Sequence, residues 1–209
     1  MKPQTTQTGR SFSCVSIATL LLASCTSGPQ HSMVETAPRV LVSGYSQTTK
    51  IPLNVELFLS DELRAAEWHG KGTRGSGNYR LDLGTVLAYN AENVTREVFS
   101  EVLVTGGSEG PGQARLPGVL IPRFVNAERY GNTLTILLEW TLRDAEDNVV
   151  WIDTIKGEGS STWSLLSPTE QQSVAVINDL FHKSFTALST SRAIREFVAK
   201  RQKQSSVQP

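Results

Sequence analysis

The sequence predicts an α/β fold of the α+β kind. This is a two-layer sandwich in which a mostly antiparallel, mixed sheet of about four to six strands carries two main helices on one face. The run Thr133–Arg143 alternates large apolar with mostly polar side chains, as a strand with one buried face does. Two stretches, beginning near Leu83 and near Pro168, repeat apolar residues at helical spacing and can cover that face. The resulting order is strand, helix, strand, three-strand meander and helix.

Composition limits the classes of function. The chain has 209 residues, 39% hydrophobic and 19% charged, which suits one globular domain with a real core. Lys plus Arg and Asp plus Glu are 20 each, so the basic surface typical of nucleic-acid binders is not expected. Both cysteines, Cys14 and Cys25, lie in the first 25 residues, so the rest of the chain has no thiol for a disulfide or a metal.

Residues 1–24 are predicted to be an export signal. Lys2 and Arg10 precede an uncharged apolar run, Phe12–Ala23, which is shorter than the roughly 20 residues that a membrane-spanning helix needs. The following Leu22–Cys25, with the sequence LASC, resembles the lipobox of bacterial lipoproteins. The resemblance implies a lipidated Cys25 as the first residue of the mature protein. An ordinary secretory signal with an incidental cysteine, or a buried helix, is the alternative.

The residues after Cys25 are predicted to form a tether. Thr26 stands where an Asp usually favours inner-membrane retention in Gram-negative lipoproteins, so the resemblance implies sorting to the outer membrane. Residues 25–38 are polar and include Pro29 and Pro38, a composition typical of a flexible linker rather than a core. A single globular periplasmic domain is expected over 39–203, with a disordered tail at 204–209.

The first half of the domain is expected to alternate strands, loops and one helix. Val40–Val42 is a candidate edge strand, and Leu53–Leu59 alternates like a half-buried strand. Ser60–Arg80 contains four glycines and is predicted to be a long flexible loop. A helix follows, capped by Asp82, and then a short strand. The residues that carry these two predictions are Leu83, Val86, Leu87, Ala91, Val94 and Val98 for the helix, and 101–105 for the strand.

The second half is expected to contain the meander and the second main helix. After a loop rich in glycine and proline, Val119–Glu128, Thr133–Arg143 and Val149–Lys156 are joined by short polar turns, which favours antiparallel neighbours. Pro122 indicates an edge position or a bulge. Ser167–Glu170, SPTE, is a capping box that starts the helix. Its apolar stripe comprises Val174, Ile177, Phe181, Phe185 and Leu188, and 192–203 is a candidate short helix with a basic end.

Few residues suggest chemistry. Residues 70–75, GKGTRG, match the dinucleotide fingerprint in letters, but that motif needs a strand directly before it and a helix directly after it, so a mobile surface loop is favoured. His31, His69 and His182 lack ligand spacing and have no cysteine beside them, so neither a metal nor a cofactor is expected. Glu67, Trp68 and His69, with Asp61 nearby, could form an acid/base cluster, but such residues are common in loops and no catalytic residue is predicted.

The element order and the lipobox together are similar to small outer-membrane lipoproteins whose domain resembles the amino-terminal domain of TolB. That group includes accessory lipoproteins of polysaccharide export, lipopolysaccharide assembly and lipid-transport ABC systems. The resemblance implies a non-catalytic protein that binds an envelope protein or forms a homo-oligomer. The alternative is a periplasmic ligand-binding or hydrolytic module that uses the Gly70–Gly77 loop.

The predicted partner-binding residues lie in Ser60–Arg80. Loops on a rigid scaffold often carry binding residues, and aromatic and arginine side chains are favoured at interfaces. The candidates are Trp68 as the anchor, with Arg74, Tyr79 and Arg80.

Overall fold

The computed structural model describes residues 33–36, 41–45, 49–71, 78–108, 110–111, 116–160 and 168–205. The chain divides into two units, Met1–His31 and Ser32–Pro209, and all of the described residues belong to the second.

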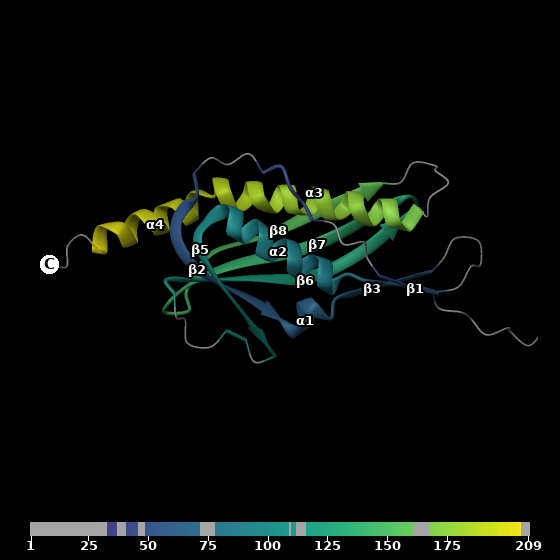
Figure 1. Ribbon diagram of the computed structural model, residues 1–209, viewed down its shortest axis with the longest axis horizontal. Coiled ribbons are helices and arrows are strands. Elements are labelled where there is room, and N and C mark those ends of the chain that lie inside the picture. Colours follow the sequence, from purple (N-terminus) through teal and green to yellow (C-terminus); the bar gives the residue numbers. More distant parts are fainter. Residues whose placement is uncertain are drawn as a thin grey trace, which may run out of the picture. The chain divides into compact units, whose positions relative to one another are not determined.

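A five-stranded mixed sheet is the centre of the fold (Figure 1). Its strand order is β5-β2-β6-β7-β8. The parallel pairs are β5 with β2 and β2 with β6, whereas β6, β7 and β8 form the predicted antiparallel meander. In chain order the strands are β2 (Ile51–Ser60), β5 (Phe99–Gly107), β6 (Gly118–Tyr130), β7 (Thr133–Asp144) and β8 (Val149–Ser160).

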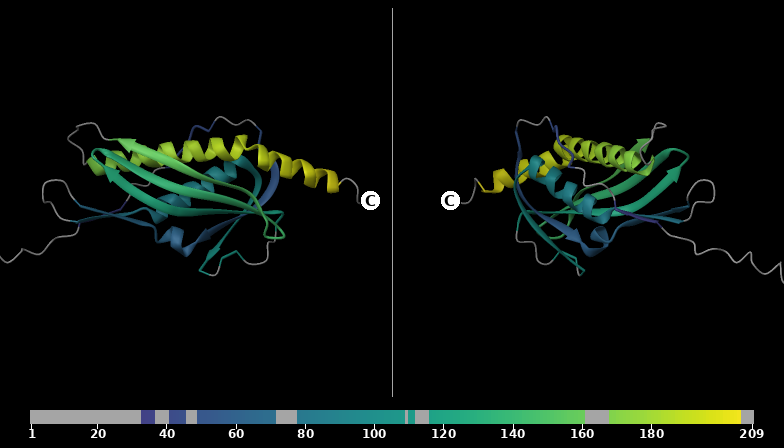
Figure 2. Two further views of the ribbon diagram at one scale, coloured as in Figure 1. Left: turned by 180° about the vertical axis from the view of Figure 1, so that it is seen from behind. Right: turned by 45° about the vertical axis from the view of Figure 1, so that its right-hand side comes forward.

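Helices cover one face of this sheet, as the two-layer prediction requires. The two main ones are α2 (Gly84–Val98) and α3 (Pro168–Thr190), which lie on the same side of the strands (Figure 2). The short α1 (Asp61–Arg64) follows β2, and α4 (Arg192–Ser205) continues beyond α3. The fold class predicted from the sequence is therefore confirmed.

The core lies between β7 and the helices. The predicted dry face of β7 is at most 1% exposed at each of Leu134, Ile136, Leu138, Trp140 and Leu142. Helix α3 contributes Ile177, Phe181, Phe185 and Leu188 as expected, but Val174 is only half-buried and Val176 is fully buried instead. Four of the five residues predicted for the apolar stripe of this helix are therefore buried, and the prediction for Val174 is wrong.

Pro122 lies where β6 has already separated from β2. Strand β2 pairs with β6 only through Gly118, Val119 and Leu120, and β6 continues beyond them with β7 alone. A proline is tolerated there because the β2 side of β6 needs no main-chain donor. A register shift follows between Phe124 and Asn126. Both features agree with the predicted edge or bulge.

Two glycines let α3 lie directly on β8. A Cβ atom on Gly159 would come within 2.4 Å of both the Gln172 oxygen and the Val176 nitrogen, and one on Gly157 would come within 2.5 Å of the Leu180 Cβ. Side chains on the same helix protect the edge of β8. The Asp179 carboxylate accepts a hydrogen bond from the Glu158 N–H at 2.8 Å, and the Lys183 ammonium donates to the Lys156 carbonyl at 3.1 Å. These bonds occupy main-chain groups that could otherwise pair with another strand.

The segment 60–80 differs from the prediction. It is not one long loop: α1 is followed by β3 (Glu67–Lys71), which pairs antiparallel with β4 (Asn78–Asp82). Strand β1 (Met33–Thr36) pairs parallel with β4 and completes a small sheet of order β1-β4-β3. The sequence placed 33–36 in the tether because the stretch around them is mostly polar and contains Pro29 and Pro38. Their strand forms by main-chain pairing with β4, which no local pattern indicated.

The candidate edge strand at Val40–Val42 is also different. The described part, Leu41–Tyr45, has no regular secondary structure. Its main chain is held by α2 instead. The Val42 N–H donates to the Asn90 side-chain oxygen at 2.9 Å, and the Val42 carbonyl accepts from Asn93 at 2.8 Å. The ring of Tyr45 stacks on Phe185 with 4.6 Å between centroids, which fixes this segment across the helices.

No helix within the described part of the chain combines the length and apolar character that crossing a membrane requires.

Candidate functional site

The β3–β4 hairpin holds most of the residues that the sequence singles out. Trp68 lies opposite Leu81, and the two side chains, 7% and 2% exposed, join the hydrophobic core. The indole also lies against Gly70, where a Cβ atom would come within 2.1 Å of the ring. The structure therefore places Trp68 inside the molecule and not at the surface where a partner anchor was expected.

The other face of the hairpin carries a small charged cluster. Glu67 accepts a hydrogen bond from the Arg80 guanidinium, and its second carboxylate oxygen lies 3.2 Å from the His69 Nε2. The hydrogen bond from Arg80 lowers the pKa of the Glu67 carboxyl, with a smaller contribution from His69. A carboxylate held ionised in this way has no proton to donate near neutral pH, so an ion pair describes this cluster better than a general acid does.

The remaining predicted site residues are only partly described. Tyr79 lies in β4 opposite Gly70, and Arg80 lies opposite His69. Arg74 and Cys25 lie outside the described residues, as does 72–77, which is most of the Gly70–Gly77 segment. Where the dinucleotide fingerprint needs a helix, β4 follows β3 instead. The structural context of that motif is thus absent from the described chain.

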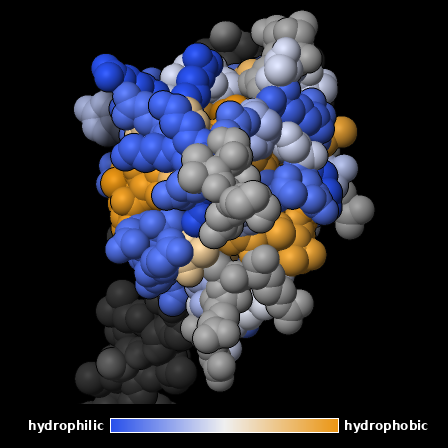
Figure 3. All heavy atoms as spheres, turned by 90° about the vertical axis from the view of Figure 1, so that its left-hand side faces the viewer, coloured by the Kyte–Doolittle hydropathy of each residue, from blue (hydrophilic) through white to orange (hydrophobic). Residues whose placement is uncertain are grey.

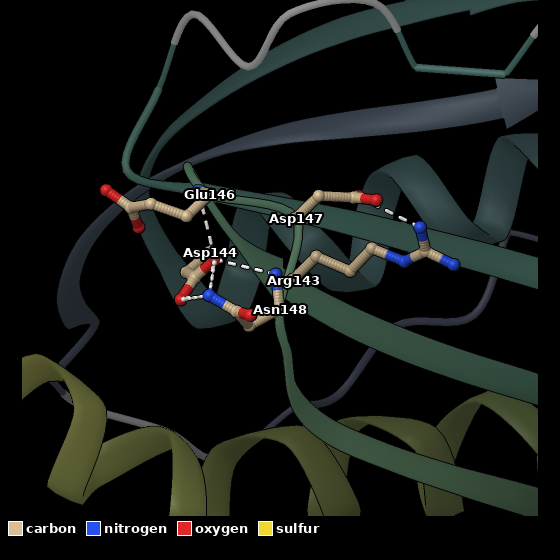
Figure 4. Close-up of polar contacts among 5 residues, drawn as sticks. All are labelled: Arg143, Asp144, Glu146, Asp147 and Asn148. Carbon is tan, nitrogen blue, oxygen red and sulfur yellow. Dashed lines mark hydrogen bonds and ion pairs between the residues drawn. The ribbon is translucent and has the colours of Figure 1, made fainter.

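The turn between β7 and β8 contains several acidic side chains, and they stabilise the turn itself (Figure 4). Asp144 Oδ1 accepts from the main-chain N–H groups of Glu146 at 3.0 Å and Asn148 at 2.8 Å. Asp147 adopts a φ of 68° and accepts a hydrogen bond from Arg143 at 2.9 Å. In the described residues, no three His, Cys, Asp or Glu side chains are grouped closely enough to hold a metal ion.

The sheet face opposite α2 and α3, which we name the open face, was not predicted as a site. Because register partners share a face, Leu103 of β5, Glu56 of β2, Val119 of β6 and Arg143 of β7 form one row across the sheet. Leu103 is 39% exposed, and Ile152 of β8, in the next row, is 56% exposed. The alternation in Val149–Lys156 was the available signal for Ile152, since it sets this residue on the opposite face from Trp151.

Charged pairs lie on the same face. Arg123 donates to Glu139 at 3.0 Å across β6 and β7, and Glu56, only 5% exposed, accepts from the Thr105 hydroxyl at 2.8 Å. Lys156 and Glu158 form a second ion pair, on β8. The open face is therefore exposed on its outer strands, at Leu103 and Ile152, and carries two ion pairs, whereas Glu56 and Val119 on its central strands are buried.

A groove of about 630 Å³ lies where the start of β2 meets the end of α3 and the helix α4. Ile51, Phe185 and Val198 form its apolar floor, and Lys50 and Arg195 supply positive charge. This volume is within the roughly 300–1,000 Å³ typical of ligand sites. Nothing in the sequence alone indicated it, because its walls come from segments more than a hundred residues apart in the chain.

Comparison with known proteins gives structural likenesses only. No family model and no curated protein matches the sequence. A Xanthomonas campestris protein of the family DUF330 is similar with a TM-score of 0.47 and 12% identity, over 84% of this chain and 100% of that one. The PelC dodecamer from Paraburkholderia phytofirmans gives a TM-score of 0.43 and 15% identity, over 76% and 96%.

A Caulobacter crescentus protein taken to be a lipoprotein gives a TM-score of 0.33 and 12% identity, over 64% of this chain and 88% of that one. All three TM-scores lie below 0.5, so these likenesses assign neither a family nor an activity.

Proposed function

We propose that this protein is a lipoprotein anchored through Cys25 to the periplasmic side of the outer membrane. It acts by binding, without catalysis, as an accessory subunit of an envelope transport or assembly system such as polysaccharide or lipid export. The lipobox-like sequence Leu22–Cys25 and the element order support the class of protein.

The open face is the observation that carries the binding role. A fold of this size buries its apolar side chains where it can, and α2 and α3 already cover the opposite face of the sheet. Leu103 and Ile152 nevertheless remain exposed, on the outer strands β5 and β8, with the Arg123–Glu139 pair on β6 and β7 between them. This mixture of apolar and charged side chains supports the proposal, since protein interfaces combine the two.

The hairpin supplies a second contact in this proposal. Among the residues predicted for it, Arg74, Tyr79 and Arg80, the described residue on the outer face is Arg80, which extends the binding surface, whereas Trp68 fixes β3 to the core. The role of Trp68 is then to position the hairpin rather than to enter a partner.

Site-specific photocrosslinking in intact cells tests the proposal. A photoreactive amino acid replaces Leu103 or Ile152 in one set of cells and Tyr89, which is 55% exposed on α2, in the control. We expect the two open-face positions to crosslink the same envelope protein, and the control position not to do so. If Tyr89 gives the same product, or neither open-face position gives one, the open face is not the binding surface.

The alternative, a hydrolytic module near the Gly70–Gly77 segment, is favoured by one observation, the contact of Glu67 with His69 and Arg80. Its test is hydrolysis of an activated acyl ester by the wild-type protein and by Glu67→Gln and His69→Gln. A rate above background that both substitutions abolish would favour the hydrolase over the accessory subunit.

A further inference from the structure

The groove between β2, α3 and α4 lies apart from the open face and the hairpin, and it has its own chemistry. Its lining residues are Thr49, Lys50, Ile51, Pro52, Phe185, Thr186, Ser189, Thr190, Arg195, Val198, Ala199 and Gln202. Figure 3 views the side on which α4 lies and shows apolar areas among hydrophilic ones. A ligand with both an apolar and a polar part would match such a surface.

The floor of the groove is rigid. Ile51, Phe185 and Val198 are each 6–8% exposed and belong to the hydrophobic core cluster. Phe185 is also stacked on Tyr45, whose segment is tied to α2. These three side chains expose little surface to the groove, so Pro52 and Ala199, which are exposed and also line it, supply further apolar contact for a chain of methylene groups.

The two cations of the groove each cap a helix. Lys50 donates to the Arg96 carbonyl near the end of α2 at 2.6 Å, and Arg195 donates to the Ser189 carbonyl near the end of α3 at 2.9 Å. Each bond uses one donor, so an ammonium and a guanidinium fixed in place still have donors for an anion. None of the lining residues is acidic, and Glu196, beside Arg195, accepts a hydrogen bond from Arg192 at 2.6 Å.

The surroundings add to the positive charge. Helix α4 contains one acidic residue, Glu196, against the basic residues Arg192, Arg195, Lys200, Arg201 and Lys203, of which Arg192 pairs with Glu196 and Arg201 with Glu146 of the β7–β8 turn. Such a field attracts anionic head groups and concentrates them near the groove.

We propose that this groove binds one acyl chain of an acidic phospholipid. The chain lies over Ile51, Phe185 and Val198, and Lys50 and Arg195 supply the positive charge for its phosphate. Charge complementarity favours this occupant over a zwitterionic lipid, and the continuous apolar floor favours it over a free polar anion. The inference does not depend on the proposed accessory function, because it concerns a different surface.

Photolabelling tests the proposal on the mature lipidated protein. The protein is reconstituted into vesicles of phosphatidylethanolamine and phosphatidylglycerol in equal parts, doped with phosphatidylglycerol that carries a diazirine on its acyl chain. Labelled peptides are then identified by mass spectrometry. We expect the label in 49–52 and in the segment from Phe185 to Gln202, and about tenfold less of it when the probe is the matched phosphatidylcholine.

Three variants distinguish binding in the groove from general electrostatic attraction of the lipid to α4. Lys50→Glu with Arg195→Glu reverses the charge of the groove, and Ala199→Trp fills it from an exposed position that should not disturb folding. Both should reduce labelling about tenfold. Lys200→Glu is the control, because Lys200 lies on the same helix but does not line the groove, and it should reduce labelling far less than the groove variants do.

The proposal is overturned if Lys200→Glu reduces labelling as much as the groove variants do, since binding would then be diffuse attraction to α4. It is also overturned if the two probes label equally, or if the label lies outside the groove, as expected if the groove instead binds an acidic peptide. Circular dichroism melting of every variant confirms that it is folded before labels are compared.

Discussion

Trp140 joins the two layers of the protein. Its side chain is fully buried among the apolar residues of β7 and the helices, and the indole N–H donates to the Ser184 hydroxyl of α3 at 3.1 Å. The same hydroxyl donates to the Leu180 carbonyl at 2.8 Å. A buried N–H without an acceptor would cost about 1–3 kcal/mol, so Ser184 makes the burial of tryptophan possible at this position.

Replacing Trp140 with alanine should destabilise the protein by about 3–5 kcal/mol, because the cavity lies in the centre of the core. Ser184→Ala should cost about 1–3 kcal/mol, since it leaves the indole N–H unpaired. Urea unfolding of both variants measures these changes. In the background of Trp140→Phe, which has no indole N–H, Ser184→Ala should cost clearly less. An equal cost in both backgrounds would show that the hydrogen bond contributes nothing.

Asp144 gives the β7–β8 turn a pH dependence. Burial raises the pKa of its carboxyl, but hydrogen bonds from the Asn148 side chain and from main-chain N–H groups lower it by more, so the pKa is below its ordinary value of 3.8. A lowered pKa in the folded state stabilises the protein above the unfolded pKa, and this contribution disappears as the pH falls through the folded pKa.

The Asp144→Ala variant should therefore be less stable than the wild type at pH 7, by on the order of 1 kcal/mol because the turn is exposed. The difference should hold down to about pH 4 and shrink below it, as the wild-type carboxyl takes up a proton. Chemical unfolding at pH 7, 5 and 3 measures this trend. Thr154→Ala, an exposed substitution elsewhere in β8 that removes no ionisable group, is the control and should show no such trend. A difference independent of pH would contradict the assigned cause.

At the scale of elements, the predictions succeeded where side chains alternate or repeat clearly. The strand β7 and the helices α2 and α3 each bury a regular apolar stripe, which is visible in the residues themselves. The β3–β4 hairpin was missed because it buries little, mainly Trp68 and Leu81, and its glycines suggested a loop. The groove and the open face depend on which strands become neighbours, and this follows from tertiary packing rather than from any local pattern.

The close contact of α3 with β8 depends on Gly157 and Gly159, which have no side chain to hold the helix away. In Gly159→Ala, the new Cβ would lie 2.4 Å from main-chain atoms of α3, which cannot rotate away as a side chain could. The helix or the strand must move, and we expect a loss of about 1–3 kcal/mol in unfolding free energy. Hydrogen exchange at the amides of β8 should accelerate together with this loss.

Gly118→Ala is the matched control for that prediction. Its nearest neighbour would be the Leu142 Cδ1 at 3.3 Å, the end of a flexible side chain that can give way. Its effect should therefore be smaller than that of Gly159→Ala. If the two substitutions cost the same, the close approach of α3 is not what requires glycine at position 159.

For the molecule as a whole, the surfaces proposed for binding are those that the packing of helices on the sheet leaves uncovered. One face of the sheet is occupied by α2 and α3, which leaves the open face, the outer side of the hairpin and the groove for other molecules. A protein that binds on several surfaces gains from being held near its partners, because tethering raises their effective concentration. The proposed anchor at Cys25 would provide this.

The anchor prediction is that Cys25→Ala abolishes acylation and releases the protein from the outer-membrane fraction, while the fold is unchanged. Several acyl chains, each contributing about 0.8 kcal/mol per buried CH₂, hold a protein stably where one chain would be marginal. Without them, release of the protein from the membrane fraction should therefore be nearly complete. Metabolic labelling with a palmitate analogue and membrane fractionation measure the two effects. Cys14→Ala, which removes the other cysteine, is the control and should keep both label and location. If the Cys25 variant still carries label and stays in the outer-membrane fraction, Cys25 is not the anchor, and an acyl chain on another residue holds the protein at the membrane.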